Sequence, residues 1–143
     1  MPSLEDRLSI DSGVPIAYLL GEETGEFART QIFQPGRILY FNRLGLAEVF
    51  YILCRRKGMN FAKEKITTFL RTNYCTFEDS HELAIEAASY KCERAVSLPD
   101  CYVIALAKLT RSTAVFARKE KEIIAEMDKR KFDIPMVFLE DLV

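Results

Sequence analysis

The strongest constraint on the fold is the order in which two kinds of apolar segment follow each other along the chain. Short segments rich in β-branched and aromatic residues have the character of strands. They cover residues 7–11, 37–42, 74–77, 112–117 and 134–142. Longer segments with apolar residues at helical spacing separate them. Because parallel strands need long crossover connections, this order predicts an α/β fold: a three-layer α/β/α sandwich with a five-stranded, mostly parallel sheet.

The segments between the predicted strands contain signals for the start and end of helices. Pro15 suits the first turn of a helix over 14–23, and the turn-forming "QPGR" follows a second, polar helix. Asn42 and Ser80 can each cap a helix, and Gly58 can end the helix that Asn42 begins. Further helices are predicted over 60–73, 80–95, 97–110 and 119–130.

Length, hydrophobicity and charge exclude several classes of protein. The 143 residues and 49% hydrophobic content suit one compact domain, which we expect to cover residues 1–143. No apolar run reaches the roughly 18 residues of a membrane span, and the first residues lack the features of a signal peptide. We therefore expect a soluble, cytoplasmic protein. A net charge of −1 does not fit a protein that coats nucleic acid by charge alone.

Sequence motifs for several common chemistries are absent. The chain contains neither of the glycine-rich phosphate loops, GxxxxGK[ST] and GxGxxG, nor the GxSxG motif of serine hydrolases. Its four cysteines are scattered singly and it has one histidine, which does not match the ligand spacing of a zinc site.

Isolated acidic residues inside apolar stretches are the feature that suggests a chemical function. Asp11 ends the first predicted strand, Glu48 lies in an apolar helix without a basic residue three or four positions away, and Asp100 opens another apolar helix. Glu120 and Glu122 begin the helix after the fourth strand. These positions can converge at the carboxyl edge of a parallel sheet. Carboxylates that share a cleft repel each other, and Mg²⁺ or Mn²⁺ would offset this repulsion.

Each of these acids also has a purely structural explanation. Asp11 and Asp100 can cap helices, the second together with Ser97 in a capping box. The acids of "RKEKEI" fit the solvated start of a helix. Glu48 has the weakest explanation of this kind, because Asn42 already caps its helix and a buried carboxylate is costly.

Four segments resemble the PIN domain family in their order and spacing. They are "IDSGVPIAYLLGEE", "LAEVFYILCRRKG", "SLPDCYVIALAKL" and "AVFARKEKEI". The branch that they resemble contains the VapC-type ribonuclease toxins and related archaeal PIN proteins, and the resemblance covers nearly the whole chain. It implies a metal-dependent endoribonuclease. The catalytic and metal-binding acids of the family correspond to Asp11, Glu48, Asp100, Glu120 and a trailing Glu122.

The chain departs from the family pattern at several positions. Glu120 replaces the usual Asp, and Arg118 replaces the usual Thr. A Glu carboxylate has a longer and more flexible stem, which loosens the geometry around Mg²⁺. Asn42 corresponds to a Ser or Thr of the family and could hydrogen-bond a phosphate or a metal-bound water. Gly13 replaces a small polar residue, although Ser12 is still adjacent to Asp11.

The leading hypothesis is hydrolysis of RNA phosphodiester bonds in a two-metal site. The three acids that match the family pattern would hold one Mg²⁺ or Mn²⁺, and Glu120 with Glu122 would help to hold a second. Arg118, Lys119 and Arg55 would steer the RNA backbone. The resemblance also implies a VapB-like antitoxin as a partner and a homodimer.

Two functions from other classes are alternatives. PIN domains with altered acids serve as non-cleaving interaction or scaffold modules, and the change at Glu120 favours this function, whereas the retained acids oppose it. A phospho-receiver domain is also a five-stranded parallel fold. It requires paired acids after the first strand and a Lys at the end of the fifth, where this chain has only Asp11 and "VFLEDL".

Overall fold

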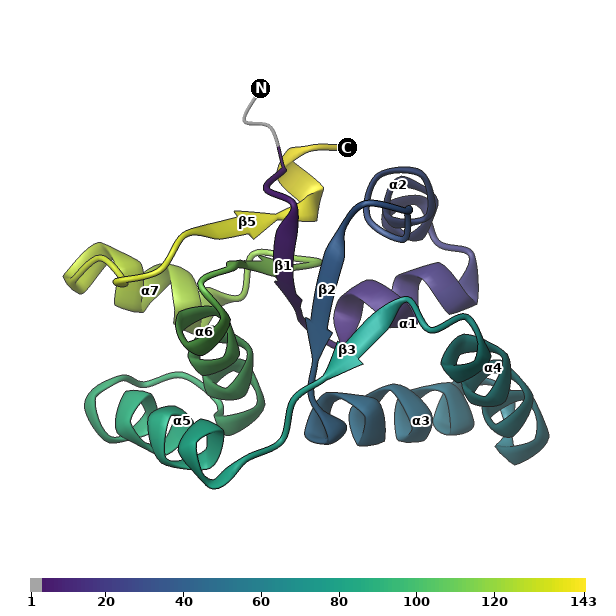
Figure 1. Cartoon of the computed structure of the whole chain (residues 1–143), viewed down its shortest axis with the longest axis horizontal. Coiled ribbons are helices and arrows are strands. Elements are labelled where there is room, and N and C mark those ends of the chain that lie inside the picture. The colour runs from purple at the N-terminus through teal and green to yellow at the C-terminus, as the bar shows by residue number, and fades with distance from the viewer. Residues whose placement is uncertain (1–3) are drawn as a thin grey trace.

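The computed structural model describes residues 4–143 and confirms the predicted α/β/α sandwich (Figure 1). The sheet has five strands in the order β3-β2-β1-β4-β5, and each neighbouring pair is parallel. The sheet is therefore wholly rather than mostly parallel. The strands are β1 (Arg7–Ile10), β2 (Ile38–Phe41), β3 (Cys75–Phe77), β4 (Thr113–Phe116) and β5 (Met136–Phe138).

Helices connect the strands and cover both faces of the sheet. They are α1 (Gly13–Leu20), α2 (Glu23–Gln31), α3 (Arg43–Lys57), α4 (Met59–Arg71), α5 (His81–Glu93), α6 (Leu98–Thr110) and α7 (Lys121–Lys129). In Figure 1, α1 to α4 lie on one side of the sheet and α5 to α7 on the other. Within residues 4–143, no helix has both the length and the apolar character needed to cross a lipid bilayer.

Each face of the sheet has its own hydrophobic core, because successive side chains of a strand point to opposite faces. Leu8 and Ile10 belong to the core beneath α1 to α4. Ser9, between them, is fully buried on the other face, where its hydroxyl donates to the carbonyl of Val103 on α6 at 2.8 Å. Ala114 and Phe116 belong to this second core. Strands buried on both faces explain why the strand segments are apolar almost throughout.

Three side chains cap helices where the sequence indicates. Asn42 accepts a hydrogen bond from the backbone N–H of Gly45 at 2.8 Å, at the start of α3. Ser80 caps α5 in the same way at 3.0 Å, and Ser97 caps α6 through the N–H of Asp100 at 3.4 Å. These caps satisfy amide groups that have no partner within the helix.

Two element boundaries differ from the predictions. The helix expected over 14–23 ends at Leu20, because Gly21 adopts a left-handed conformation with φ of 70° and terminates it. The strand expected over 134–142 is only β5, and a short 3₁₀ helix (Leu139–Asp141) follows it. In this 3₁₀ helix the side chain of Leu139 is fully buried in the core beneath α1 to α4.

Candidate active site

The candidate site lies where the strand order changes direction. In the sheet, β2 and β3 lie on one side of β1, and β4 and β5 lie on its other side. Ligands of open α/β sheets bind beyond the carboxyl ends of the strands at such a switch point. Asp11 follows β1 directly at this edge, and its N–H donates to the carbonyl of Val115 on β4 at 2.9 Å.

A cavity of about 330 Å³ at this edge brings the five predicted acids together. They come from four segments that are distant in sequence: the end of β1, α3, the first turn of α6, and the start of α7. Asp11, Glu48 and Asp100 are half-buried, whereas Glu120 and Glu122 are exposed. The lining includes Asp11, Ser12, Gly13, Glu48, Ser97, Asp100, Arg118, Glu120 and Glu122.

Gly13 allows the Asp11 carboxylate to approach the backbone. The N–H of Gly13 donates to Oδ2 of Asp11 at 3.0 Å. A Cβ atom at position 13 would lie 2.8 Å from this oxygen and 3.1 Å from the Cβ of Ala117. Any larger residue would therefore push the carboxylate away, which gives a physical reason for glycine here.

The cavity makes its carboxylates difficult to ionise. The pKa of Asp11 is raised from 3.8 to about 7. Burial is the largest cause and repulsion from Asp100 is the next, whereas the hydrogen bond from Gly13 lowers this pKa. Burial raises the pKa of Asp100 from 3.8 to about 6, with a hydrogen bond to Ser97 acting in the other direction. Burial also raises the pKa of Glu48, and hydrogen bonding with the Ser12 side chain opposes this rise. A cation in the cavity would relieve these costs.

The donor set fits a hard divalent cation. The titratable acceptors around the cavity are carboxylates, and Mg²⁺ and Mn²⁺ prefer oxygen ligands. Among the residues described, however, no three His, Cys, Asp or Glu side chains stand in an arrangement ready to hold a metal ion. Cation binding would therefore require the carboxylates to move closer together than their mutual repulsion favours.

Sequence reasoning missed two charged residues of this cavity, Glu22 and Arg56. Oε1 of Glu22 lies 3.8 Å from Nη1 of Arg56, and its Oε2 lies 3.7 Å from Nη2 of Arg118. Glu22 reaches the cavity because Gly21 reverses the chain between α1 and α2. That glycine was the available signal for the reversal, and the prediction placed it inside a helix.

Three residues with predicted roles in RNA binding do not line the cavity. Asn42 is 1% exposed and acts as the cap of α3, and its Nδ2 is buried without a hydrogen-bond partner. The guanidinium group of Arg55 lies over the ring of Tyr51, 5.1 Å from its centroid. Lys119 is bound to the C-terminal segment, where its Nζ lies 2.8 Å from Oδ1 of Asp141. Of the three basic residues expected to steer RNA, only Arg118 lines the cavity.

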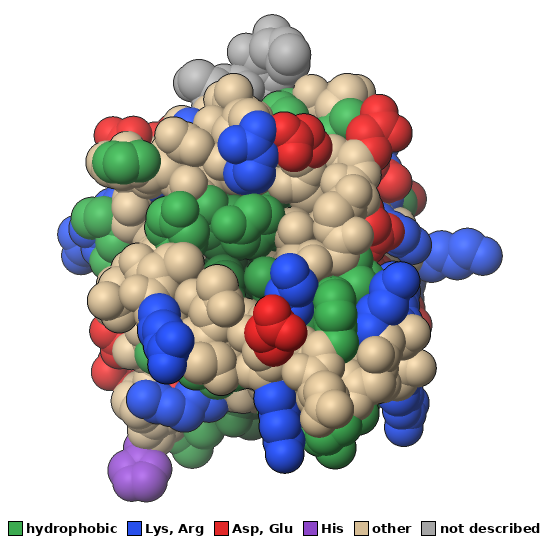
Figure 2. All heavy atoms as spheres, turned by 90° about the vertical axis from the view of Figure 1, so that its right-hand side faces the viewer, with side chains coloured by type: hydrophobic (Ala, Val, Ile, Leu, Met, Phe, Trp, Pro, Cys, Tyr) green, Lys and Arg blue, Asp and Glu red, His purple; other side chains and the backbone are tan. Residues whose placement is uncertain are grey.

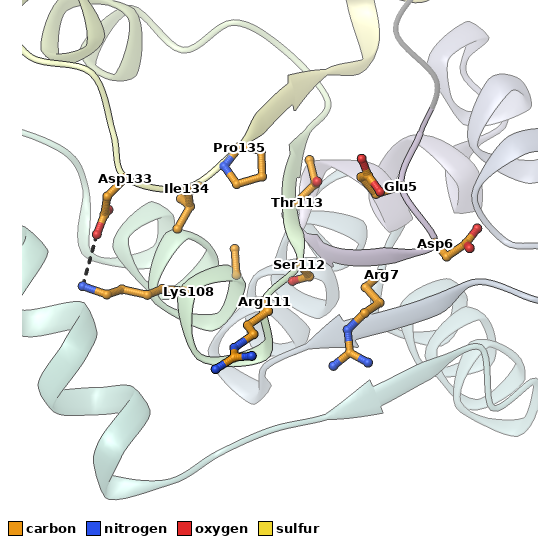
Figure 3. Close-up of a pocket in the computed structure, with 11 residues that line it drawn as sticks. Glu5, Asp6, Arg7, Lys108, Arg111, Ser112, Thr113, Asp133, Ile134 and Pro135 are labelled. Carbon is orange, nitrogen blue, oxygen red and sulfur yellow. Dashed lines mark ion pairs between the residues drawn. The ribbon is translucent and has the colours of Figure 1, made fainter.

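A larger cavity, of about 560 Å³, lies at the opposite edge of the sheet (Figure 3). Two of its basic side chains already have partners. Lys108 pairs with Asp133 at 3.1 Å, and the Arg7 guanidinium donates to the carbonyl of Thr110 at 2.9 Å. Because it faces the amino ends of the strands, whereas ligands of open α/β sheets bind beyond the carboxyl ends, this cavity is not the candidate site.

The sequence also matches a known family over most of its length. A family model of the PIN domain matches residues 8–129. The chain belongs to the PIN domain family. The predicted resemblance is therefore confirmed, and the matched region contains each of the five acids in the cavity. No curated protein matches the chain in a direct comparison.

Solved structures share this PIN fold at low sequence identity. A toxin–antitoxin complex from Klebsiella pneumoniae contains a chain with a TM-score of 0.65 and 18% identity, covering 93% of this chain and 97% of that one. VapC20 of Mycobacterium tuberculosis is a toxin that cleaves the sarcin–ricin loop. Its structure has a TM-score of 0.65 and 16% identity, and the match covers 83% of this chain and 93% of that one. PAE2754 of Pyrobaculum aerophilum has a TM-score of 0.59 and 16% identity, and the match covers 99% of this chain and 95% of that one.

Proposed function

We propose that this PIN-domain chain is a Mg²⁺- or Mn²⁺-dependent endoribonuclease. The observation that supports this best is the convergence of five carboxylates from four segments in one cavity. Such a cluster is unfavourable unless cations offset its charge, and perturbed carboxyl groups in a cleft favour a functional site over a structural one. The similarity to VapC20, a toxin that cleaves the sarcin–ricin loop, supports RNA as the substrate.

Charge balance in the cavity supports the need for cations. With Glu22 included, six carboxyl groups and two guanidinium groups line it. An RNA phosphate would be repelled from this excess of negative charge, and divalent cations would reverse the repulsion. A protein with a net charge of −1 could thus bind a polyanion at this one place.

The residues of the chain have separable roles in this proposal. Asp11, Glu48 and Asp100 would hold one cation, and the exposed pair Glu120 and Glu122 would help to hold a second. When bound, Mg²⁺ or Mn²⁺ supplies Lewis-acid polarisation of the phosphodiester and activation of the attacking water. The hydrogen bond from Gly13 fixes one oxygen of the Asp11 carboxylate, so that its other oxygen is the free ligand.

The proposal extends to partners and location. We propose that residues 1–143 form a single domain, that the protein acts in the cytoplasm as a homodimer, and that a VapB-like antitoxin binds it. The similarity to a chain of a toxin–antitoxin complex supports an antitoxin. Figure 2 shows the side that carries α2 and α4, where hydrophobic side chains gather in a shallow recess with Lys and Arg side chains around it. An apolar segment of a partner could cover this recess.

The test is metal-dependent cleavage of single-stranded RNA by the purified chain. Glu48→Gln and Asp100→Asn should each lower the cleavage rate by at least about 100-fold, since loss of even an outer partner of a metal ligand costs about 10–100-fold. Glu64→Gln, an exposed carboxylate on α4, is the matched control and should retain the wild-type rate. Cleavage that survives both substitutions, or that proceeds equally in a chelator, contradicts the mechanism.

A non-cleaving interaction module is the second candidate function. The Glu at position 120, exposed at the start of α7 where the family has Asp, favours it. Calorimetric titration separates the two functions. A chain that binds no Mg²⁺ or Mn²⁺ at millimolar concentration would be a scaffold, and binding together with cleavage would exclude this alternative.

A further inference from the structure

Two arginines at the wall of the acid cavity share one carboxylate. Arg56 is in the last turn of α3, Arg118 follows β4, and Glu22 lies between α1 and α2. Oε1 of Glu22 faces Arg56 at 3.8 Å and Oε2 faces Arg118 at 3.7 Å. Among residues 4–143, Glu22 is the one carboxylate within 4.0 Å of either guanidinium. Neither arginine pairs with the five acids proposed to hold metal.

These ion pairs are loose and open to exchange. Both separations exceed the roughly 2.7–2.9 Å of a charge-assisted hydrogen bond. The side chains of Arg56 and Arg118 are 53% and 69% exposed, so water screens their attraction to Glu22. A phosphate has more acceptor oxygens than a carboxylate and suits the planar donor fork of arginine, so it can replace Glu22 with shorter contacts.

The geometry points to a phosphate subsite formed by Arg56 and Arg118, which binds the RNA backbone next to the cleavage position and which Glu22 occupies in the free chain. This inference rests on the proposed nuclease function, because that function brings a backbone phosphate to the cavity. Glu22 then acts as an internal competitor: RNA must displace its carboxylate before both arginines can bind. Removal of this charge should therefore strengthen RNA binding.

The neighbouring Arg55 provides a matched control. It has the same charge as Arg56, is adjacent to it in α3 and is exposed. Its guanidinium group lies over the ring of Tyr51, and it does not line the cavity. A general effect of positive charge on RNA affinity would involve Arg55 as much as Arg56, whereas the defined subsite requires Arg56 and not Arg55.

The experiment measures binding of a fluorescently labelled single-stranded RNA by anisotropy. All proteins have the Asp100→Asn substitution, which keeps the RNA intact. Arg56→Ala and Arg118→Ala should each weaken binding about threefold to tenfold, and each should reduce the slope of log affinity against log salt by about 0.7 between about 50 and 200 mM salt. Glu22→Gln should strengthen binding about threefold. Arg55→Ala should change neither quantity.

The outcomes separate this inference from the nuclease proposal. If Arg56→Ala resembles Arg55→Ala, or if Glu22→Gln fails to strengthen binding, the subsite is wrong even where the chain with Asp100 intact cleaves RNA. If the expected pattern is found but the chain with Asp100 intact leaves RNA uncut with Mg²⁺ and Mn²⁺, the subsite is correct and the nuclease proposal fails. No RNA binding by any of the Asp100→Asn proteins overturns the subsite, and cleavage by the chain with Asp100 intact then decides the nuclease proposal separately. Millimolar inorganic phosphate should compete with RNA less effectively once either arginine is removed. Equal competition would contradict phosphate recognition at this place.

Discussion

Replacement of Asp11 by Asn is expected to stabilise the protein in the absence of divalent metal. Burial and neighbouring carboxylates raise the pKa of Asp11 from 3.8 to about 7. One pKa unit corresponds to about 1.4 kcal/mol, so ionised Asp11 lowers the free energy of unfolding by up to about 4 kcal/mol. Asn has no charge and keeps an oxygen to accept the N–H of Gly13. We expect Asp11→Asn to raise the free energy of unfolding by about 2–4 kcal/mol at about pH 8.

The sign of the pH dependence follows from the direction of the pKa shift. Because the folded chain holds the Asp11 proton more tightly than the unfolded chain, stability conferred by this group is present below pH 3.8 and is lost as pH rises to about 7. The advantage of Asp11→Asn should therefore grow across this interval. Urea denaturation in a chelator at a series of pH values measures it.

A control substitution and the addition of Mg²⁺ test this prediction further. Asp128→Asn, an exposed aspartate on α7, should change stability little at any pH. Addition of Mg²⁺ should stabilise the wild type more than Asp11→Asn, because the variant lacks one of the proposed metal ligands. A variant that is no more stable than the wild type at alkaline pH, or whose gain is equal at all pH values, would refute the assignment of Asp11 to a crowded carboxylate cluster.

Three further substitutions test other parts of the structure. Arg94→Ala should lower the unfolding free energy in urea by about 3–5 kcal/mol, because buried Arg94 donates to the carbonyls of residues 126, 130 and 131 and pairs with buried Glu126 at 3.8 Å. A loss of unfolding free energy below about 1 kcal/mol for Arg94→Ala would contradict this prediction. Gly13→Ala should weaken Mg²⁺ binding in calorimetry at least about tenfold, because its Cβ would lie 2.8 Å from Oδ2 of Asp11. Ser80→Ala should cost about 1 kcal/mol of unfolding free energy through loss of the α5 cap.

The fold was predictable because local patterns and tertiary packing agree at most elements. The segment containing Leu8 and Ile10 alternates between apolar and polar residues, as expected for a strand, and Ser9 is accommodated on the other buried face because it bonds to α6. The agreement fails after β5. The spacing of Leu139 and Leu142 suits a 3₁₀ turn as well as an extended strand, and the choice depends on packing against the core beneath α1 to α4.

The acids of the site were predictable for a different reason. Asp11 and Glu120 follow strands whose carboxyl ends must meet in a parallel sheet, so topology alone brings them together. Glu22 and Arg56 follow no such rule. Gly21 and Gly58 signal where α1 and α3 end, but the place of Glu22 and Arg56 at the cavity depends on how these helices pack, which local patterns do not determine. Arg55 and Arg56 are equivalent in the sequence and are distinguished only by the packing of the folded chain.

The strand order has a consequence for the timing of synthesis. β1 is made first, but its neighbour β4 ends only at Phe116, and Glu122 follows later still. A chain growing on the ribosome contains Asp11 and Glu48 well before the acids of α6 and α7 exist. Pairing of β1 with β4 must also wait for contacts that are distant along the sequence, which slows folding. The cavity is thus completed only after the start of α7 has been synthesised, so the proposed nuclease activity requires a chain that extends at least to Glu122.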